Sequence, residues 1–194
     1  EDRYREETQM EKTQRFDRKL VFENGREFLG AGFGSPREAL CQCSFDTAMI
    51  GYQEILSDPA CAGEALVMTY PVIGSYGMAD EDYEPRACYA GCLIVRRYND
   101  RPSNFRYTKT LEEVMVENDI PGIQGVDTRA IGRMLRDEGS MKVLLTDKDT
   151  SLEKAMELIR QAAPEEGLAK KVGGKKIRYS RTANFRYNVA AVDC

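Results

Sequence analysis

Six cysteines and no histidine limit the chemistry that this chain can perform with its own side chains. Cys41-x-Cys43 and Cys88-x3-Cys92 could together donate four thiolates to zinc, but neither pair has the spacing usual in zinc knuckles. Cys41 and Cys43 alternate along one apolar strand face, and Cys88 and Cys92 flank the start of another strand. We interpret them as small buried hydrophobic side chains. No cysteine has the Gly-x-Cys-x-Gly turn of a nucleophile elbow, and the lack of histidine excludes Cys-His and Ser-His catalysis and histidine-bound metals within these residues.

An acidic cluster formed by Asp80, Glu81, Asp82 and Glu84 offers oxygen ligands for Ca²⁺ or Mg²⁺. It does not fit an EF-hand loop, because proline stands at the sixth position and glycine at the twelfth. A solvated acidic loop is therefore the favoured interpretation. The alternative is a self-sufficient carboxylate- or metal-dependent enzyme that uses Asp80, Asp82 or Glu54 as metal ligands or acid-base groups. Stoichiometric divalent metal in the purified protein would favour that alternative.

Basic residues gather in two places. Residues 167–192 contain seven bases and no acid, and Arg129, Arg133 and Arg136 share one face of a predicted helix. The overall charge is -4, and few aromatic residues are interleaved with the bases. We therefore expect no nucleic-acid partner and interpret the basic run up to residue 186 as a charged linker. The alternative is a nucleic-acid binder that works through this tail, with an affinity that falls steeply with salt and is lost when residues 168–186 are deleted. The arginine face is either solvent-exposed or a subunit contact. The glycines of residues 30–34 lack a phosphate-loop pattern and are interpreted as strand-end and turn glycines.

The composition is that of an ordinary globular protein, with 194 residues of which 42% are hydrophobic and 31% charged. The longest apolar runs are about six residues, far short of the roughly 20 that a membrane-spanning helix needs. No secretory signal pattern opens the chain. We therefore expect a cytoplasmic protein with reduced thiols and no membrane contact.

The amino-terminal half predicts strands joined by tight turns. Residues 19–23 and 26–33 form a predicted hairpin around Asn24-Gly25, a pair that favours a type I′ turn. Residues 39–45 alternate with one apolar face, and residues 64–70 and 90–96 are further predicted strands. A short helix through GYQEIL is predicted between them, with Thr47 or Asp46 as its cap and Asp58-Pro59 as its end.

The second half is dominated by helix signals. Thr110 and Glu113 form a capping box for a helix that ends near Asn118, and Asp127 caps another that ends at Gly139. Residues 141–146 form a predicted strand. Thr150 and Glu153 suggest a second capping box, for a helix that buries three apolar side chains, namely Leu152, Met156 and Ile159. Strands come early and helices late, which favours α+β layers over a doubly wound sheet.

Several separated strings together identify a family. FDTAMIGYQEILSDPA (residues 45–60), VMTYPVIGSYG (67–77), RPSNFR (101–106) and IPGIQGVDTRAIGRMLRDEG (120–139) resemble the amino-terminal domain of the small, glutaminase subunit of carbamoyl phosphate synthetase. The similarity runs in order from about residue 19 to residue 146. The ending RYNVAAVDC resembles the first strand of the class I glutamine amidotransferase domain that follows in that family.

This resemblance implies a three-layer β/β/α amino-terminal domain that ends in the first strand of a truncated α/β glutamine amidotransferase domain. We divide the chain into a disordered leader (residues 1–18), the β/β/α domain (19–150), a helix with a basic linker (151–186) and the first glutaminase strand (187–194). The implied enzyme makes carbamoyl phosphate from bicarbonate, ATP and glutamine for arginine and pyrimidine synthesis. Its small subunit hydrolyses glutamine at a Cys-His-Glu site and passes ammonia to a large, ATP-using subunit.

The resemblance also assigns what this chain is expected to lack. No catalytic residue of the glutaminase site lies in it, and ATP and divalent metal would belong to the large subunit. Ala60 stands where many family members have a serine that contacts glutamine, so no substrate-binding role is carried onto it. The expected partners are the large subunit, the missing glutaminase domain and glutamine. The residues that we expect at an interface or in domain packing are Tyr52, Gln53, Glu54, Asp58, Asp127, Thr128 and Arg129.

Overall fold

The computed structural model describes residues 16–79 and 88–163 and, beyond them, residues 167, 168, 172, 173, 186, 187, 189 and 190. Within these residues the elements follow the order β1 (Arg18–Phe22), β2 (Glu27–Gly34), β3 (Ala39–Asp46), α2 (Tyr52–Ser57), the 3₁₀ turn η1 (Pro59–Cys61), β4 (Ala65–Met68), β5 (Cys92–Val95), α3 (Leu111–Glu117), β6 (Pro121–Gln124), α4 (Thr128–Glu138), β7 (Met141–Asp147) and α5 (Leu152–Gln161). This mixture of strands and helices confirms the α+β prediction.

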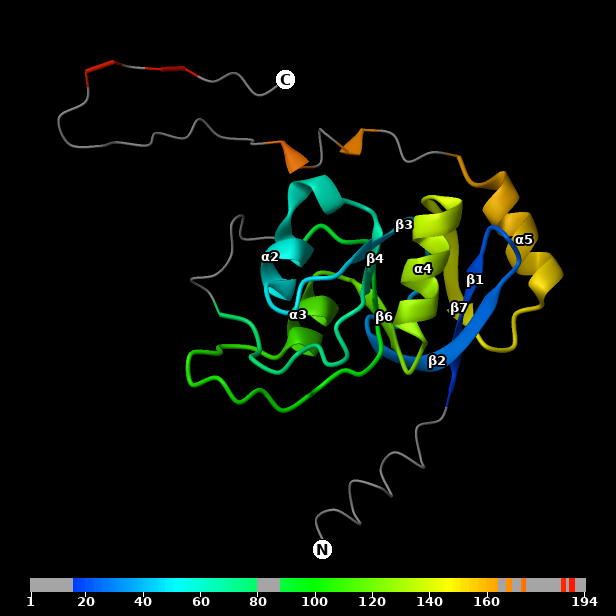
Figure 1. Ribbon diagram of the computed structural model, residues 1–194, viewed down its shortest axis with the longest axis horizontal. Coiled ribbons are helices and arrows are strands. Elements are labelled where there is room, and N and C mark those ends of the chain that lie inside the picture. Colours follow the sequence, from blue (N-terminus) through cyan, green and yellow to red (C-terminus); the bar gives the residue numbers. More distant parts are fainter. Residues whose placement is uncertain are drawn as a thin grey trace, which may run out of the picture.

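The strands close into a barrel in the order β1-β2-β6-β5-β4-β3-β7. The neighbouring pairs β3–β4, β4–β5 and β5–β6 are parallel. The remaining pairs, β1–β2, β1–β7, β2–β6 and β3–β7, are antiparallel. Closure leaves no strand edge unpaired within the barrel. Figure 1 shows α5 on the outside next to β1 and β7, and α2 and α3 on the opposite side of the barrel.

Three apolar clusters hold these layers together. The barrel interior buries alternate strand residues, among them Leu20, Phe22 and Val143, and α4 adds Ile131, Met134 and Leu135 to the same cluster. Because α4 contributes to the interior, it covers the end of the barrel where β1 and β3 finish and β7 begins. A second cluster packs α2 and α3 on the outer faces of β4 and β5, and a third packs α5 on β1 and β7.

The cysteine interpretation is confirmed for the strand positions. Cys41, Cys43 and Cys92 are buried in the barrel interior, and Cys88 is half-buried against the second cluster. Burial raises the pKa values of the Cys43 and Cys92 thiols, and it raises the pKa of Cys88 to about 11. These thiols therefore stay protonated and unreactive near neutral pH. In the part of the chain that the structure describes, no group of three or more Cys, Asp or Glu side chains is arranged to hold a metal ion.

The first hairpin is confirmed, but its predicted turn type is wrong. Gly25 N donates to Phe22 O at 2.8 Å and Phe22 N donates to Arg26 O at 2.9 Å, so the loop has three residues. Gly25 has a positive φ of 82°, whereas Asn24 does not adopt a positive φ. A type I′ turn would need both. The observed loop instead matches the three-residue hairpin that ends in a left-handed glycine.

Two predicted caps and two predicted burial positions are also wrong. Gly51, rather than Thr47 or Asp46, is the N-cap of α2. Ser151, rather than Thr150, caps α5 through a bond from Lys154 N. Leu152 is exposed, and Phe45 is partly exposed at the end of β3, so neither side chain completes the apolar face expected of it.

One residue was expected to be irregular but lies in a strand. Arg18, expected in the leader, begins β1 and pairs with Gly30 and Asp147, and its guanidinium also forms an ion pair with Asp147 at 2.9 Å and a hydrogen bond to the Arg37 carbonyl. Residues 30–34 lie in the last part of β2, as the prediction of a strand end has it. Gly30 allows β2 to approach β6, since a Cβ there would lie 2.5 Å from the Gln124 carbonyl oxygen.

Candidate interaction surface

Helix α2 begins without a side-chain cap of its own and is capped from a distant loop. Its N-cap, Gly51, has a left-handed φ of 89°. The Tyr76 hydroxyl accepts hydrogen bonds from Gly51 N at 2.8 Å and from Tyr52 N at 3.0 Å. These are two of the amide groups that have no partner inside the helix. Tyr76 therefore caps the N-terminus of α2, a role that a Ser or Asp at the N-cap position itself usually has.

Tyr52, the first residue of α2, makes further contacts with the loop that carries Tyr76. Its ring stacks on that of Tyr76 with the centroids 4.2 Å apart. Its hydroxyl donates to Gly77 O at 2.6 Å, and the residue is buried. Burial raises the pKa of both phenols above the usual value, although hydrogen bonds from the α2 amides oppose the rise at Tyr76. Both tyrosines are therefore neutral over the physiological pH range and act as hydrogen-bonding groups.

Gln53 fixes the next part of the same loop. Its side chain is fully buried, its amide nitrogen donates to Ala79 O at 2.6 Å, and its amide oxygen accepts from Ala79 N at 2.9 Å. A primary amide side chain has both a hydrogen-bond donor and an acceptor, so Gln53 can make both of these bonds at the same time. We call Tyr52, Gln53 and Tyr76 the α2 lock, because together they bind α2 to residues 76–79.

The outward side of the same segment is formed by Glu54, Asp58 and Ala60. Glu54 and Ala60 are exposed. Asp58 follows α2 and accepts a bond from Ala60 N at 2.8 Å, so it caps the η1 turn. Met49 and Ile50, just before the helix, are also exposed. The α2–η1 segment thus offers a short surface of mixed apolar and acidic character on a helix held rigidly from behind.

The start of α4 carries the other predicted group. Asp127 caps the helix by accepting from Ala130 N at 3.0 Å, as predicted. Thr128 is buried and Arg129 is exposed. Arg133 and Arg136 are exposed on the same helix, and Arg136 pairs with the adjacent Asp137 at 3.0 Å. The structure therefore places an exposed arginine face on α4, and the interface role assigned to Arg129 stays a prediction.

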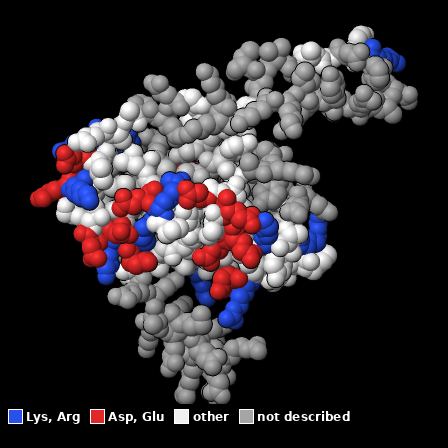
Figure 2. All heavy atoms as spheres, turned by 180° about the vertical axis from the view of Figure 1, so that it is seen from behind, with Lys and Arg blue, Asp and Glu red and all other residues white. Residues whose placement is uncertain are grey.

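Several predicted features lie outside the described residues. The acidic cluster of residues 80–84 is one, and most of the basic run between residues 167 and 192 is another, as is most of the expected terminal strand. Figure 2, which shows the face behind that of Figure 1, has Asp and Glu side chains gathered across its middle with Lys and Arg around them. That face does not offer a continuous basic surface to a polyanion.

Sequence reasoning missed Tyr76, and it assigned Tyr52 and Gln53 to an interface or to domain packing without showing that they bind residues 76–79. Tyr76 lies between two glycines with positive φ, Gly74 and Gly77, in a segment without regular structure. A tyrosine there carries no local signal that it caps a helix 24 residues earlier.

Removing the Tyr76 hydroxyl is expected to weaken the α2 lock. In Tyr76→Phe, the ring stack persists but the Gly51 and Tyr52 amides lose their acceptor, so the free energy of unfolding should fall by about 1 kcal/mol, the usual effect of losing a helix N-cap. Urea denaturation followed by circular dichroism measures the change. Tyr70→Phe removes the hydroxyl of a partly exposed tyrosine and serves as the matched control. Equal stability of the two variants would contradict the capping role.

Comparisons with known proteins place the chain in a family. Residues 20–145 match the model of the carbamoyl-phosphate synthase small chain, CPSase domain. The chain is 39% identical over 145 residues to the carbamoyl phosphate synthase small chain of Oceanobacillus iheyensis, covering 75% of this chain and 40% of that protein. It is 40% identical over 144 residues to the pyrimidine-specific small chain of Bacillus subtilis, covering 74% of this chain and 40% of that protein.

A third relative extends the aligned region. The small chain of Aquifex aeolicus is 38% identical over 168 residues, covering 86% of this chain and 45% of that protein. Among solved structures, an aminopeptidase from Aneurinibacillus sp. strain AM-1 aligns with a TM-score of 0.41 and 11% identity, over 68% of this chain and 30% of that one, which is too slight a likeness to bear on function.

The match over residues 20–145 covers more than half of the sequence, and it includes all strands of the barrel in whole or in large part. The chain therefore belongs to the carbamoyl-phosphate synthase small chain family and contains its CPSase domain. It spans 40–45% of the length of the three relatives named above. In the described residues, no helix is both long and apolar enough to cross a bilayer.

Proposed function

We propose that this chain is the amino-terminal, supporting domain of the small chain of a glutamine-hydrolysing carbamoyl phosphate synthase. The observation that carries the proposal is the family match over residues 20–145. The absence of histidine from the sequence agrees with it, because a Cys-His-Glu glutaminase site must then draw on other sequence. Relatives named as pyrimidine-specific small chains support a role in pyrimidine synthesis, and a role in arginine synthesis stays a prediction.

In this proposal the domain performs no chemistry itself. The small chain hydrolyses glutamine elsewhere, ammonia reaches a large chain that uses ATP and divalent metal, and carbamoyl phosphate is formed there in an ATP-dependent ligase reaction. The α2–η1 surface, with Glu54, Asp58 and Ala60, packs near the glutaminase domain and its glutamine. The buried Tyr52 and Gln53 hold that surface in place, and the Asp127–Arg129 start of α4 contributes to docking.

Two finer parts of the family resemblance belong to the same proposal. We assign the barrel with its outer helices to the three-layer β/β/α class, and residues 187–194 to the first strand of a glutamine amidotransferase domain. The α5 helix packs on β1 and β7 through Ala155 and Ile159, which supports including it with the barrel. The competing idea of a carboxylate- or metal-dependent enzyme gains no support from the family match.

A two-part measurement tests the proposal. The purified 194-residue chain is incubated with glutamine and ammonia release is followed with a glutamate dehydrogenase-coupled assay; no release above a heat-treated control is expected. The same protein is then titrated with the purified large chain of the same organism, and a saturable complex is expected. Glutamine turnover by the chain alone, or failure to bind the large chain, would contradict the proposal.

A further inference from the structure

The segment between β5 and α3, residues 96–109, is a structured loop, although it contains no regular element. We call it the 96–109 loop. It runs beside residues 73–78 and bonds to them along its length. Asn99 N donates to Ile73 O at 2.8 Å, Ser103 N donates to Ser75 O at 2.9 Å, and Thr108 N donates to Met78 O at 2.9 Å. Its backbone is therefore held in one path by the strip of chain that also carries Tyr76.

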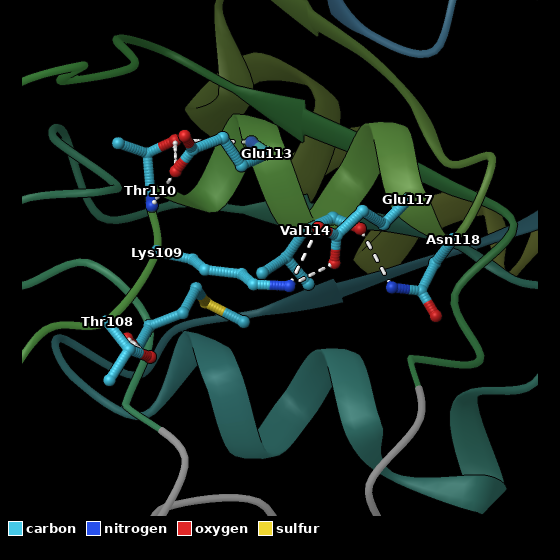
Figure 3. A network of polar contacts seen from close by, with 8 residues as sticks. Thr108, Lys109, Thr110, Glu113, Val114, Glu117 and Asn118 are labelled. Carbon is cyan, nitrogen blue, oxygen red and sulfur yellow. Dashed lines mark hydrogen bonds and ion pairs between the residues drawn. The ribbon is translucent and has the colours of Figure 1, made fainter.

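The far end of the loop is fastened to α3. Figure 3 shows Lys109 lying along the helix toward Glu117, with Nζ 2.6 Å from Oε2. It also shows the capping box next to it, in which the Glu113 carboxylate accepts from Thr110 N at 2.7 Å. Hydrogen bonds from Thr110 lower the pKa of the Glu113 carboxyl, so this cap stays charged and intact at neutral pH. The carboxyl-terminal end of the loop is therefore held by contacts with α3, just as its backbone is held by residues 73–78.

Two asparagine turns shape the tip. Asn99 Oδ1 accepts from Arg101 N at 3.2 Å, and Asn104 Oδ1 accepts from Arg106 N at 3.1 Å. Such turns replace backbone pairing where the chain reverses. Phe105 lies inside the second turn and is 93% exposed, more than any other large apolar side chain of the described residues. The exposed Phe105 ring is therefore carried by a backbone that hydrogen bonds hold in place, and it does not lie at a frayed chain end.

The charge around Phe105 differs from that of the whole chain. The loop contains five cations, namely Arg96, Arg97, Arg101, Arg106 and Lys109, and one acid, Asp100, whereas the chain as a whole carries -4. Interfaces are enriched in aromatic residues and arginine, and their energetic anchors are large side chains that enter pockets on the partner. An exposed phenyl ring in a loop that carries four arginines fits an apolar pocket with a carboxylate rim.

We propose that the 96–109 loop is a protein-docking loop in which Phe105 is the anchor, and that its partner is a protein surface with an aromatic-sized apolar pocket rimmed by carboxylates. The overall charge of -4 favours a protein over a nucleic acid, because the chain as a whole lacks the basic excess that binding to phosphates requires. The identity of the partner rests on the proposed function, and we assign this pocket to the large chain.

Binding of the purified large chain to the immobilised 194-residue chain tests the inference. Phe105→Ser is expected to raise the Kd roughly 30-fold or more, the effect of removing an interface anchor. Arg101→Glu should slow association and reduce its dependence on salt. The control Leu29→Ser, at an exposed apolar position on β2 outside the loop, should change the Kd less than about 2-fold. Thermal melts of all variants confirm that the fold is retained.

The outcomes separate the two proposals. If the unaltered chain binds and Phe105→Ser binds equally well, the docking role of the loop is overturned while the proposed function stands. If the unaltered chain does not bind the large chain at all, the proposed function fails and the partner assigned to the loop fails with it. Binding of a single-stranded oligonucleotide that is lost in Phe105→Ser would overturn the inference in favour of base stacking.

Discussion

Phe22→Ala should lower the free energy of unfolding by about 3–5 kcal/mol, the cost observed when a large aromatic side chain is removed from a packed core. Phe22 is fully buried in the barrel interior and meets the edge of Phe28 with the ring centroids 5.7 Å apart. It pairs with Val143 where β1 meets β7, the contact that closes the barrel. A loss of this size removes a large part of the roughly 5–15 kcal/mol by which a typical domain is stable.

Urea denaturation followed by circular dichroism is the measurement, and a lower midpoint with an unchanged slope is the expected result. Phe105→Ala is the matched control, because it removes the same atoms from a side chain that is 93% exposed. That variant should stay within about 0.5 kcal/mol of the unaltered protein. A loss below about 1 kcal/mol for Phe22→Ala would mean that β1 does not fill the barrel interior as described.

The features that the sequence predicted correctly depend on groups close together along the chain. The Thr110–Glu113 capping box and the Asp127 cap each join residues three positions apart, and both are present. Alternation along residues 39–45 gave three buried positions of β3, namely Ala39, Cys41 and Cys43, because side-chain direction in a strand has a period of two, although Phe45 at the end of the strand is exposed. Such signals are complete within one segment, so no knowledge of the tertiary fold is needed to interpret them.

The features that the sequence did not predict depend on distant partners. Closure of the barrel requires β1 to pair with β7 and β2 to pair with β6, and no local pattern encodes which strands become neighbours. The local sequence favours Thr47 or Asp46 as the cap of α2, because an Asp or Thr usually serves that role, yet the actual acceptor is the Tyr76 hydroxyl. Even in the first hairpin, Asn24-Gly25 located the turn but not its length, since a three-residue loop uses a left-handed glycine as well.

The same division applies to the candidate site. The sequence named Tyr52, Gln53 and Glu54 together as residues of an interface or of domain packing, but it could not show that Tyr52 and Gln53 face inward while Glu54 faces solvent. That distinction comes from residues 76–79, which lie beside α2 only in the folded chain. The polar side chains of Tyr52 and Gln53 therefore hold the segment in place, and Glu54, Asp58 and Ala60 form its outer surface.

Gln53→Ala should lower the free energy of unfolding by about 2–4 kcal/mol. The substitution removes both partners of Ala79, and each buried group left without a hydrogen bond costs about 1–3 kcal/mol. Gln53→Met separates this effect from the loss of volume, because methionine fills similar space but cannot donate to Ala79 O or replace the amide oxygen. Gln42→Ala, at an exposed position bonded to Ser140, is the matched control and should stay within about 0.5 kcal/mol.

Hydrogen exchange gives a second, local readout of the same bond. The Ala79 amide donates to Gln53 Oε1 in the unaltered protein, so it should be protected, and in Gln53→Met it should exchange faster even under conditions where the global stability is still high. Exchange at the Ile123 amide, in β6 of the barrel, should change no more than the global stability does. If the Ala79 amide exchanged at the same rate in both proteins, residues 76–79 would be held by the tyrosine contacts alone. If it alone exchanged faster, Gln53 would be the residue that fastens the end of this segment to α2 and thereby fixes the surface carrying Glu54, Asp58 and Ala60.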